Sequence, residues 1–83
     1  MDLEERVRKT VSLFKENIGL IDGVTLTRDE KHIVDLAKMY ASDTDSWIRK
    51  NDYVTAFSSI EYAHGLLDAV LKIKGKDPYG HDK

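Results

Sequence analysis

The segment "NDYVTAFSSIEYAHGLLDAV", residues 51–70, decides the predicted fold of this chain. Asn51 and Asp52 are typical of a helix start, because their short side chains accept hydrogen bonds from the first backbone N–H groups of a helix. Apolar residues then recur every three or four positions, which is the spacing of one face of an α-helix. Gly75 is typical of a helix end. We therefore expect a long helix over residues 53–74.

This predicted helix has two apolar sides. The wider side consists of Ala56, Phe57, Ile60, Ala63, Leu67, Val70 and Leu71. The second side, almost opposite, consists of Tyr62, Leu66, Ala69 and Ile73. A helix that is apolar on two sides is usually central in its domain or lies against another subunit. We expect the wider side to contact the helix that precedes it in the chain, and the second side to contact either the first helix or a second copy.

Two further helices precede this one. The first, over residues 3–18, is predicted by an apolar stripe that consists of Leu3, Val7, Val11, Phe14 and Ile18. The start of the second, over residues 28–50, is predicted by Thr27 and Glu30. These two residues have the spacing of a capping box, in which each side chain accepts a hydrogen bond from the other residue's backbone N–H.

The predicted fold class is all-α. The link between the second and third helices is so short that the two must run antiparallel, as a helical hairpin. We therefore expect a three-helix bundle with a C-terminal antiparallel hairpin. It should form a single domain over residues 1–75, followed by a flexible tail at residues 76–83.

Composition argues against several classes of protein. The 83 residues include no cysteine, so we expect neither disulfides nor thiolate metal sites. Thirteen Lys and Arg against 15 Asp and Glu give a net charge of −2, whereas nucleic-acid-binding proteins usually show a basic excess or stripe. No apolar run approaches the roughly 18 residues of a membrane span, and the N-terminus lacks the apolar core of a signal peptide. We expect a cytoplasmic protein with neither membrane nor nucleic acid as its partner.

His64 lies within the wider apolar side, and Asp68 follows it one turn later. One hypothesis makes His64 an acid/base or metal-ligating residue that Asp68 orients. The alternative is a histidine at the edge of the core, hydrogen-bonded to a carbonyl or to Asp68. A zinc site needs three or four converging ligands, and neither His32 nor His81 is an obvious third one. We expect no metal site and no cofactor.

The third helix contains several small residues. Within a helix, glycine is about 1 kcal/mol less favourable than alanine, so some interaction should offset Gly65. We expect Ala56, Ala63 and Gly65 to let neighbouring backbones approach closely. A ligand lying against the exposed backbone at Gly65 is the alternative.

The aromatic residues favour a structural role. Tyr40 and Trp47 lie seven residues apart on the apolar face of the second helix, where aromatic side chains are more often core than a stacking platform for bases. Their polar tips should reach the rim of the core. Asp43, near the edge of that face, is expected to accept a hydrogen bond from a tyrosine of the third helix.

A combination of motifs spans the second half of the chain. It comprises a tyrosine in the second helix, an Asp-Tyr pair at the turn with an alanine three residues later, and the run Tyr-Ala-x-Gly-Leu-Leu-Asp-Ala. These positions are Tyr40, Asp52, Tyr53, Ala56, Tyr62, Ala63, Gly65, Leu66, Leu67, Asp68 and Ala69. With them, residues 37–75 resemble a small archaeal family catalogued as domain of unknown function 357. The resemblance implies a compact all-α archaeal protein, and it brings no activity, cofactor or catalytic residue.

The leading functional hypothesis is a non-enzymatic protein–protein interaction or self-assembly module. It would bind through the exposed edge of the third or the first helix, because no catalytic constellation is evident and the chain is barely large enough to cover a two-sided apolar helix. An RNA- or nucleotide-binding accessory protein and a small-ligand or metal-binding helical protein are the alternatives. The candidate binding residues are Tyr62, His64, Leu66, Asp68 and Ile73.

Overall fold

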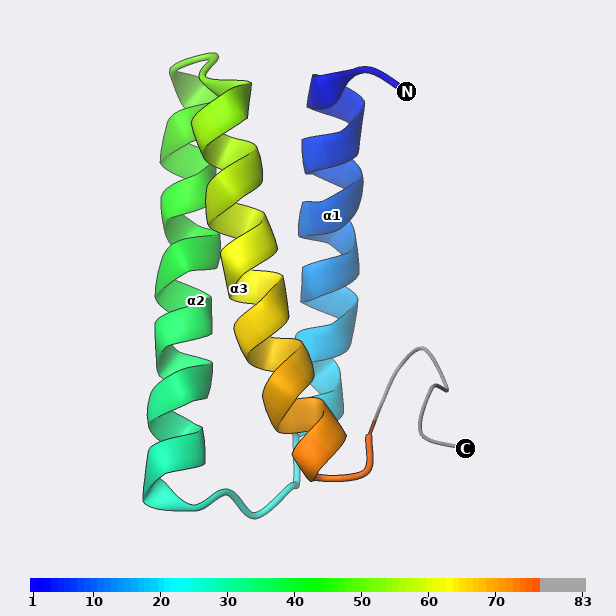
Figure 1. Cartoon of the computed structure of the whole chain (residues 1–83), viewed down its shortest axis with the longest axis vertical. Coiled ribbons are helices and arrows are strands. Elements are labelled where there is room, and N and C mark those ends of the chain that lie inside the picture. Colours follow the sequence, from blue (N-terminus) through cyan, green and yellow to red (C-terminus); the bar gives the residue numbers. More distant parts are fainter. Residues whose placement is uncertain (77–83) are drawn as a thin grey trace.

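The computed structural model describes residues 1–76 of the chain. In order, its elements are helix α1 (Leu3–Ile18), a 3-10 turn η1 (Gly19–Ile21), helix α2 (Arg28–Arg49) and helix α3 (Tyr53–Ile73) (Figure 1). Each helix begins and ends within one residue of its predicted range. The predicted tail, apart from Lys76, lies outside the described residues, as does His81.

Helix α3 is the central element of the all-α bundle. It packs against α2 along one flank and against α1 along the other, whereas α1 and α2 contact each other at most at isolated points. Figure 1 shows α3 crossing the middle of the molecule between the other two helices. The bundle is consequently flat, with extents of 37 × 27 × 16 Å.

The hydrophobic core is built around the wider apolar side of α3. Its fully buried residues Ile60, Ala63, Leu67 and Leu71 pack with Phe14 of α1 and Ala37 of α2. One apolar side therefore serves both neighbouring helices.

Small residues and a shared carbonyl hold α2 against α3. Ala37, Ala56 and Ala63 have no exposed surface, and side chains this small let the two backbones approach. The Ser59 hydroxyl of α3 donates a 2.7 Å hydrogen bond to the Tyr40 carbonyl of α2. The prediction that the wider side of α3 contacts α2 is confirmed.

The second apolar side of α3 is not covered by the rest of residues 1–76. Tyr62 is 52% exposed and Ile73 is 66% exposed, Ala69 is also exposed, and Leu66 is half-buried. The first helix, one of the two expected neighbours of this side, therefore does not cover it, and that alternative is wrong. Helix α1 instead lies against the edge of the wider side, where its Phe14 ring meets His64 edge-on with centroids 6.0 Å apart.

The helix ends follow the predicted capping chemistry. The Thr27 hydroxyl accepts from the Glu30 N–H at 3.1 Å, and the Glu30 carboxylate accepts from the Thr27 N–H at 2.9 Å, which is the capping box at the start of α2. Asp52 caps α3 by accepting from the Thr55 N–H at 3.0 Å.

The turn between α2 and α3 explains why the hairpin is so tight. Asn51 has φ 57°, in the left-handed region that asparagine tolerates better than most residues. The Asp52 N–H reaches back to the Trp47 carbonyl at 2.9 Å, and the Asn51 N–H to the Ile48 carbonyl at 2.9 Å. These bonds form a Schellman motif, which satisfies the last carbonyls of α2. Asn51 thus ends one helix and Asp52 starts the next.

An ion pair closes the opposite end of the hairpin. The Lys74 ammonium, at the end of α3, lies 2.7 Å from the Glu30 carboxylate at the start of α2. Lys74, and then the Thr27 N–H, hold the pKa of Glu30 below its usual value. At the turn, the backbone N–H and then the hydroxyl of Thr55 lower the pKa of Asp52. Each end of the hairpin therefore carries a carboxylate that is stabilised in its ionised form.

Acid should weaken both ends of the hairpin. Because the folded-state pKa values of Glu30 and Asp52 lie below those of the unfolded chain, their contribution is present above about pH 4 and is lost as the pH falls through the folded values. We expect the Glu30→Gln/Asp52→Asn variant to lose less unfolding free energy between about pH 6 and pH 3 than the wild type in urea titrations. Glu16→Gln, an exposed α1 carboxylate, is the control. The same acid dependence in the double variant and the wild type would contradict the assignment.

Candidate functional site

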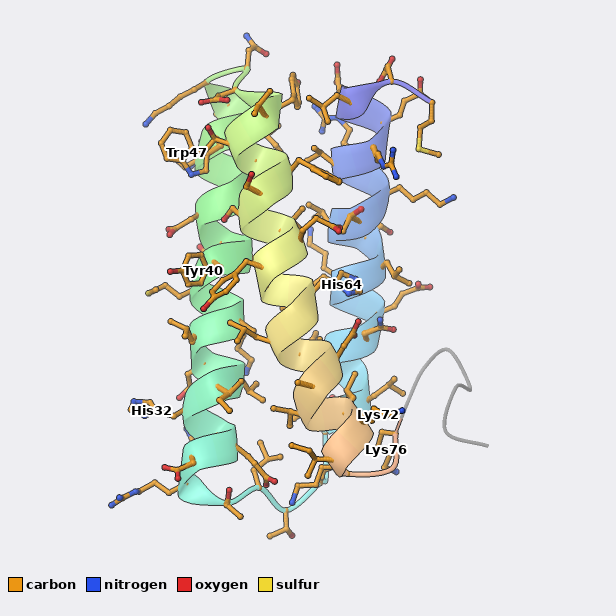
Figure 2. The ribbon with its side chains drawn as sticks, viewed as in Figure 1. His32, Tyr40, Trp47, His64, Lys72 and Lys76 are labelled. Atoms are coloured by element: carbon orange, nitrogen blue, oxygen red, sulfur yellow. The ribbon has the colours of Figure 1, made fainter. Side chains whose placement is uncertain are left out.

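The α1–α3 groove contains the histidine that the sequence singled out. It has a volume of about 280 Å³ and is lined by Thr10, Leu13, Glu61, His64, Gly65 and Asp68. Figure 2 shows the His64 ring lying between α3 and α1. The residue is only 7% exposed. The groove therefore meets the edge of a largely buried imidazole.

His64 and Asp68 form a loose pair. The His64 Nδ1 atom lies 3.5 Å from an Asp68 carboxylate oxygen, at the outer limit of a hydrogen bond. The His64 Nε2 atom and the other Asp68 oxygen are buried without a hydrogen-bond partner, and so is the amide nitrogen of Asn17 on α1. This arrangement is that of a histidine at the edge of the core beside Asp68. Sequence reasoning did not predict that Asn17 would be buried.

The described residues do not assemble a metal-ligand set around this pair. Within residues 1–76, no three His, Asp or Glu side chains converge closely enough to hold a metal ion. His32 projects from the outer side of α2, away from His64 (Figure 2).

The α2–α3 groove lies along the other flank of α3. It measures about 360 Å³ and is lined by Tyr40, Asp43, Trp47, Thr55, Ser58, Ser59 and Tyr62. The Tyr40 and Tyr62 rings meet edge-to-face with centroids 4.7 Å apart and planes inclined by 76°, a favourable aromatic geometry. Of the hydrogen bonds among residues 1–76, none joins Asp43 to a tyrosine. The predicted bond is replaced by the contact between the two rings.

The remaining predicted structural residues serve the fold. Ala56 is buried at the α2–α3 contact. Tyr53, half-buried at the start of α3, approaches α1: Glu4, and then Tyr53, raise the pKa of the Arg8 guanidinium.

Gly65 does not mediate packing within the chain. It is exposed, and nothing lies within 4 Å of the position that a Cβ atom would occupy. The close-packing interpretation therefore holds for Ala56 and Ala63, which are fully buried, and is wrong for Gly65 within one chain. Gly65 makes no such contact because it lies on the outward face of α3.

The outward face of α3 carries a row of exposed uncharged residues, which we call the α3 stripe and which exposed Glu61 and Lys72 border. It consists of Val54, Ser58, Tyr62, Gly65, Ala69 and Ile73, all of them exposed. Sequence reasoning found Tyr62, Ala69 and Ile73 but missed Val54 and Ser58. The signal was available in their spacing of four residues from each other and from Tyr62.

A third groove, between α1 and α2, was not predicted. It is floored by α3 because α1 and α2 do not pack against each other. Its volume is about 360 Å³, and its apolar lining consists of Val11, Phe14, Ile18, Ala41 and Ile60. Lys15, Lys38 and Asp45 also line it. Charges of both signs thus interrupt this surface, unlike the α3 stripe.

Comparison with known proteins identifies a family whose sequence pattern this chain matches. A family model described as "Protein of unknown function (DUF357)" matches residues 7–75, which is most of the chain. No curated protein matches the sequence. Among residues 1–76, no helix has the length and apolar character that crossing a membrane would require.

Replacing His64 by leucine tests whether the imidazole is merely tolerated at the edge of the core. The change removes a buried Nε2 atom that has no partner and keeps an apolar side chain against Phe14. We expect the unfolding free energy to stay unchanged or to rise by up to about 1 kcal/mol in urea titrations. Leu67→Ala, at a fully buried position of the same helix, should instead lose about 2–5 kcal/mol. A loss of about 2 kcal/mol or more for His64→Leu would show that the imidazole stabilises the fold.

Gly65→Ala should stabilise the isolated chain. The new methyl group meets open space, and alanine is about 1 kcal/mol more favourable than glycine within a helix. Thermal unfolding at low protein concentration measures this gain. Gly75→Ala is the matched control and should destabilise the chain, because Gly75 has φ 69° in the left-handed region. A destabilised Gly65→Ala variant would mean that the helix is constrained at this point.

Proposed function

The chain belongs to the DUF357 family of proteins of unknown function, and we propose that it is a non-enzymatic protein–protein interaction module whose binding surface is the α3 stripe. One observation carries the proposal. The most exposed side of the central helix presents large apolar side chains, with Val54 70%, Tyr62 52% and Ile73 66% exposed. Large apolar side chains exposed along one side of a helix are typical of interaction sites on folded proteins.

The contrast with the other helices supports this choice. The outward face of α2 carries Lys31, Asp35, Lys38, Asp45 and Arg49, and that of α1 carries Glu4, Glu5, Arg8, Lys9 and Glu16. In the 21 residues of α3 the charged side chains are Glu61, Asp68 and Lys72, and none belongs to the α3 stripe. The exposed side of α3 therefore carries two charged residues, Glu61 and Lys72, where α1 and α2 each carry at least five. A surface with so few charges on a solvent-facing helix favours contact with a partner over contact with water.

The shape of the α3 stripe suits another helix. Ser58, Gly65 and Ala69 are small, which allows a partner backbone to approach closely, as small residues do at tight helix contacts. Tyr62 stands between them, and its ring is held by the edge-to-face contact with Tyr40. A side chain that is already restrained loses less conformational entropy on binding. The α3 stripe therefore combines an aromatic anchor with small neighbours, as interaction surfaces often do.

The non-enzymatic part of the proposal rests on His64. It pairs with a carboxylate beside a groove, yet only 7% of its surface is exposed and its Nε2 atom is buried. A general acid or base must come within hydrogen-bonding distance of the group it protonates or deprotonates. In this conformation Nε2 is closed to a substrate, and Nδ1 is directed to the Asp68 carboxylate.

Affinity capture with matched surface variants tests the proposal. The wild-type chain, Ala69→Glu and Ser42→Glu are immobilised separately and exposed to an extract of the cells that naturally produce the protein. Ala69 and Ser42 are both small and exposed, but Ser42 lies on α2 at the α1–α2 groove. We expect the wild type and Ser42→Glu to retain a common protein, whether a different protein or further copies of the chain, and Ala69→Glu to lose it.

Circular dichroism shows whether a loss of binding is caused by misfolding of a variant. Far-UV circular dichroism should give the same helix content for all three proteins, because both substitutions are at exposed helical positions. Retention of identical proteins by all three would contradict an interaction through the α3 stripe. Loss with Ser42→Glu alone would move the binding surface to the α1–α2 groove.

A further inference from the structure

We infer that the α3 stripe binds a second copy of the chain, with the two α3 helices antiparallel across a two-fold axis that passes between positions 63 and 64. This inference rests on the proposed function and names its partner. A two-fold interface requires a surface that is complementary to itself, and the α3 stripe has that property.

The spacing of the α3 stripe reads the same in both directions. From Val54 to Ile73 its residues are separated by four, four, three, four and four positions. Reversing the helix about the point between positions 63 and 64 therefore places every residue of the α3 stripe opposite another one. The resulting pairs are Val54 with Ile73, Ser58 with Ala69, and Tyr62 with Gly65 of the other copy.

The residue sizes in these pairs fit a close contact at the centre. Tyr62, the largest residue of the α3 stripe, lies opposite Gly65 of the second copy. Gly65 has no side chain, and no atom of its own copy lies within 4 Å of the position that a Cβ atom would occupy, so there is room for the ring. The symmetry repeats this contact on the other side of the axis. Ser58 and Ala69, both small, pair in the next layer. The larger Val54 and Ile73 meet at the ends, where two crossing helices diverge and leave more room.

Charge and area agree with a second copy. The residues of the α3 stripe are uncharged, so none of them carries an ion into the contact, and the charges that border it are Glu61 and Lys72. A net charge of −2 gives little repulsion between copies. A 21-residue helix is about 30 Å long. Together with the adjoining α2–α3 groove, at a helix spacing of about 10 Å, the face covers on the order of 600 Å² per copy. Two such faces approach the lower limit of a stable interface, about 1,200 Å².

Uncovered apolar surface continues on α2 beside the α3 stripe. Leu36 is 36% exposed, and Tyr40 and Trp47 line the α2–α3 groove together with Tyr62. A second hairpin laid over the first would cover these residues as well, as in an antiparallel four-helix arrangement of two hairpins. This contact with α2 is the part of the estimated area that α3 alone does not supply, and the total is that of a weak, reversible dimer.

Cysteine pairing tests the register directly, because the chain has no native cysteine. Ser58→Cys and Ala69→Cys are oxidised separately and as an equimolar mixture. In the inferred register, the cysteine at position 58 of one copy faces the cysteine at position 69 of the other, whereas two identical positions lie about 16 Å apart along the helices. A disulfide requires Cα atoms within about 7 Å. We expect a covalent dimer from the mixture and none from either variant alone.

Light scattering of the unmodified chain over a range of concentrations accompanies this test. We expect the mass to rise toward twice the 9.5 kDa of one chain, with Ala69→Glu staying at the monomer mass and Ser42→Glu behaving as the wild type. Disulfide-linked homodimers of each single variant, with no mixed dimer between positions 58 and 69 in the mixture, would show parallel pairing and overturn the inferred register. A wild type that stays monomeric at every concentration would overturn the second copy as partner. Binding of a different protein in the capture experiment would then still support the proposed function. If neither experiment showed binding that Ala69→Glu abolishes, both the second copy as partner and the proposed function would be contradicted.

Discussion

The close contact between α2 and α3 is the constraint on which the rest of this structure depends. Three alanines without exposed surface and the hydroxyl bond from Ser59 to the Tyr40 carbonyl bring the two helices together. Both ends of this hairpin are closed by capped helix termini, and the Glu30–Lys74 pair joins one of them. Because α3 then contacts α2 along one flank, α1 has only the other flank available. The flat order α2–α3–α1 follows, and so does the uncovered outward face of α3 (Figure 1).

A flat order has consequences for a chain of 83 residues. Small domains bury a smaller share of their surface than large ones, and a single layer of helices buries less than a rounded bundle of the same length. Each of the two neighbouring pairs, α1–α3 and α2–α3, leaves a groove, and the separation of α1 from α2 leaves a third one over α3. All three are lined partly by charged residues that face water readily. The α3 stripe differs from them because its own residues, from Val54 to Ile73, are uncharged.

The sequence predicted the helices and their caps because these are local properties. Periodicity and capping residues act over a few positions, so the bounds of all three helices and the Thr27–Glu30 box could be derived from neighbouring residues. Which helix covers which side of α3 could not be derived in this way. Periodicity shows that residues share a face, but it does not show where a neighbouring helix lies. Helix α1 lies against the edge of the wider side, which periodicity alone could not predict. The same limit explains the error at Gly65 and the missed burial of Asn17.

Gly65 connects the stability of the chain with its proposed binding. Within a helix it is less favourable than alanine by about 1 kcal/mol, and no packing contact among residues 1–76 offsets this, since its neighbourhood there is open. A small chain has little stability to spare, so an unfavourable residue on an otherwise free surface calls for a reason outside the single chain. The adjacent Tyr62 supplies one, because a large ring and an absent side chain at mirrored positions are complementary across a two-fold axis. In the proposed dimer the glycine is therefore favourable for the pair, although it is unfavourable for the isolated chain.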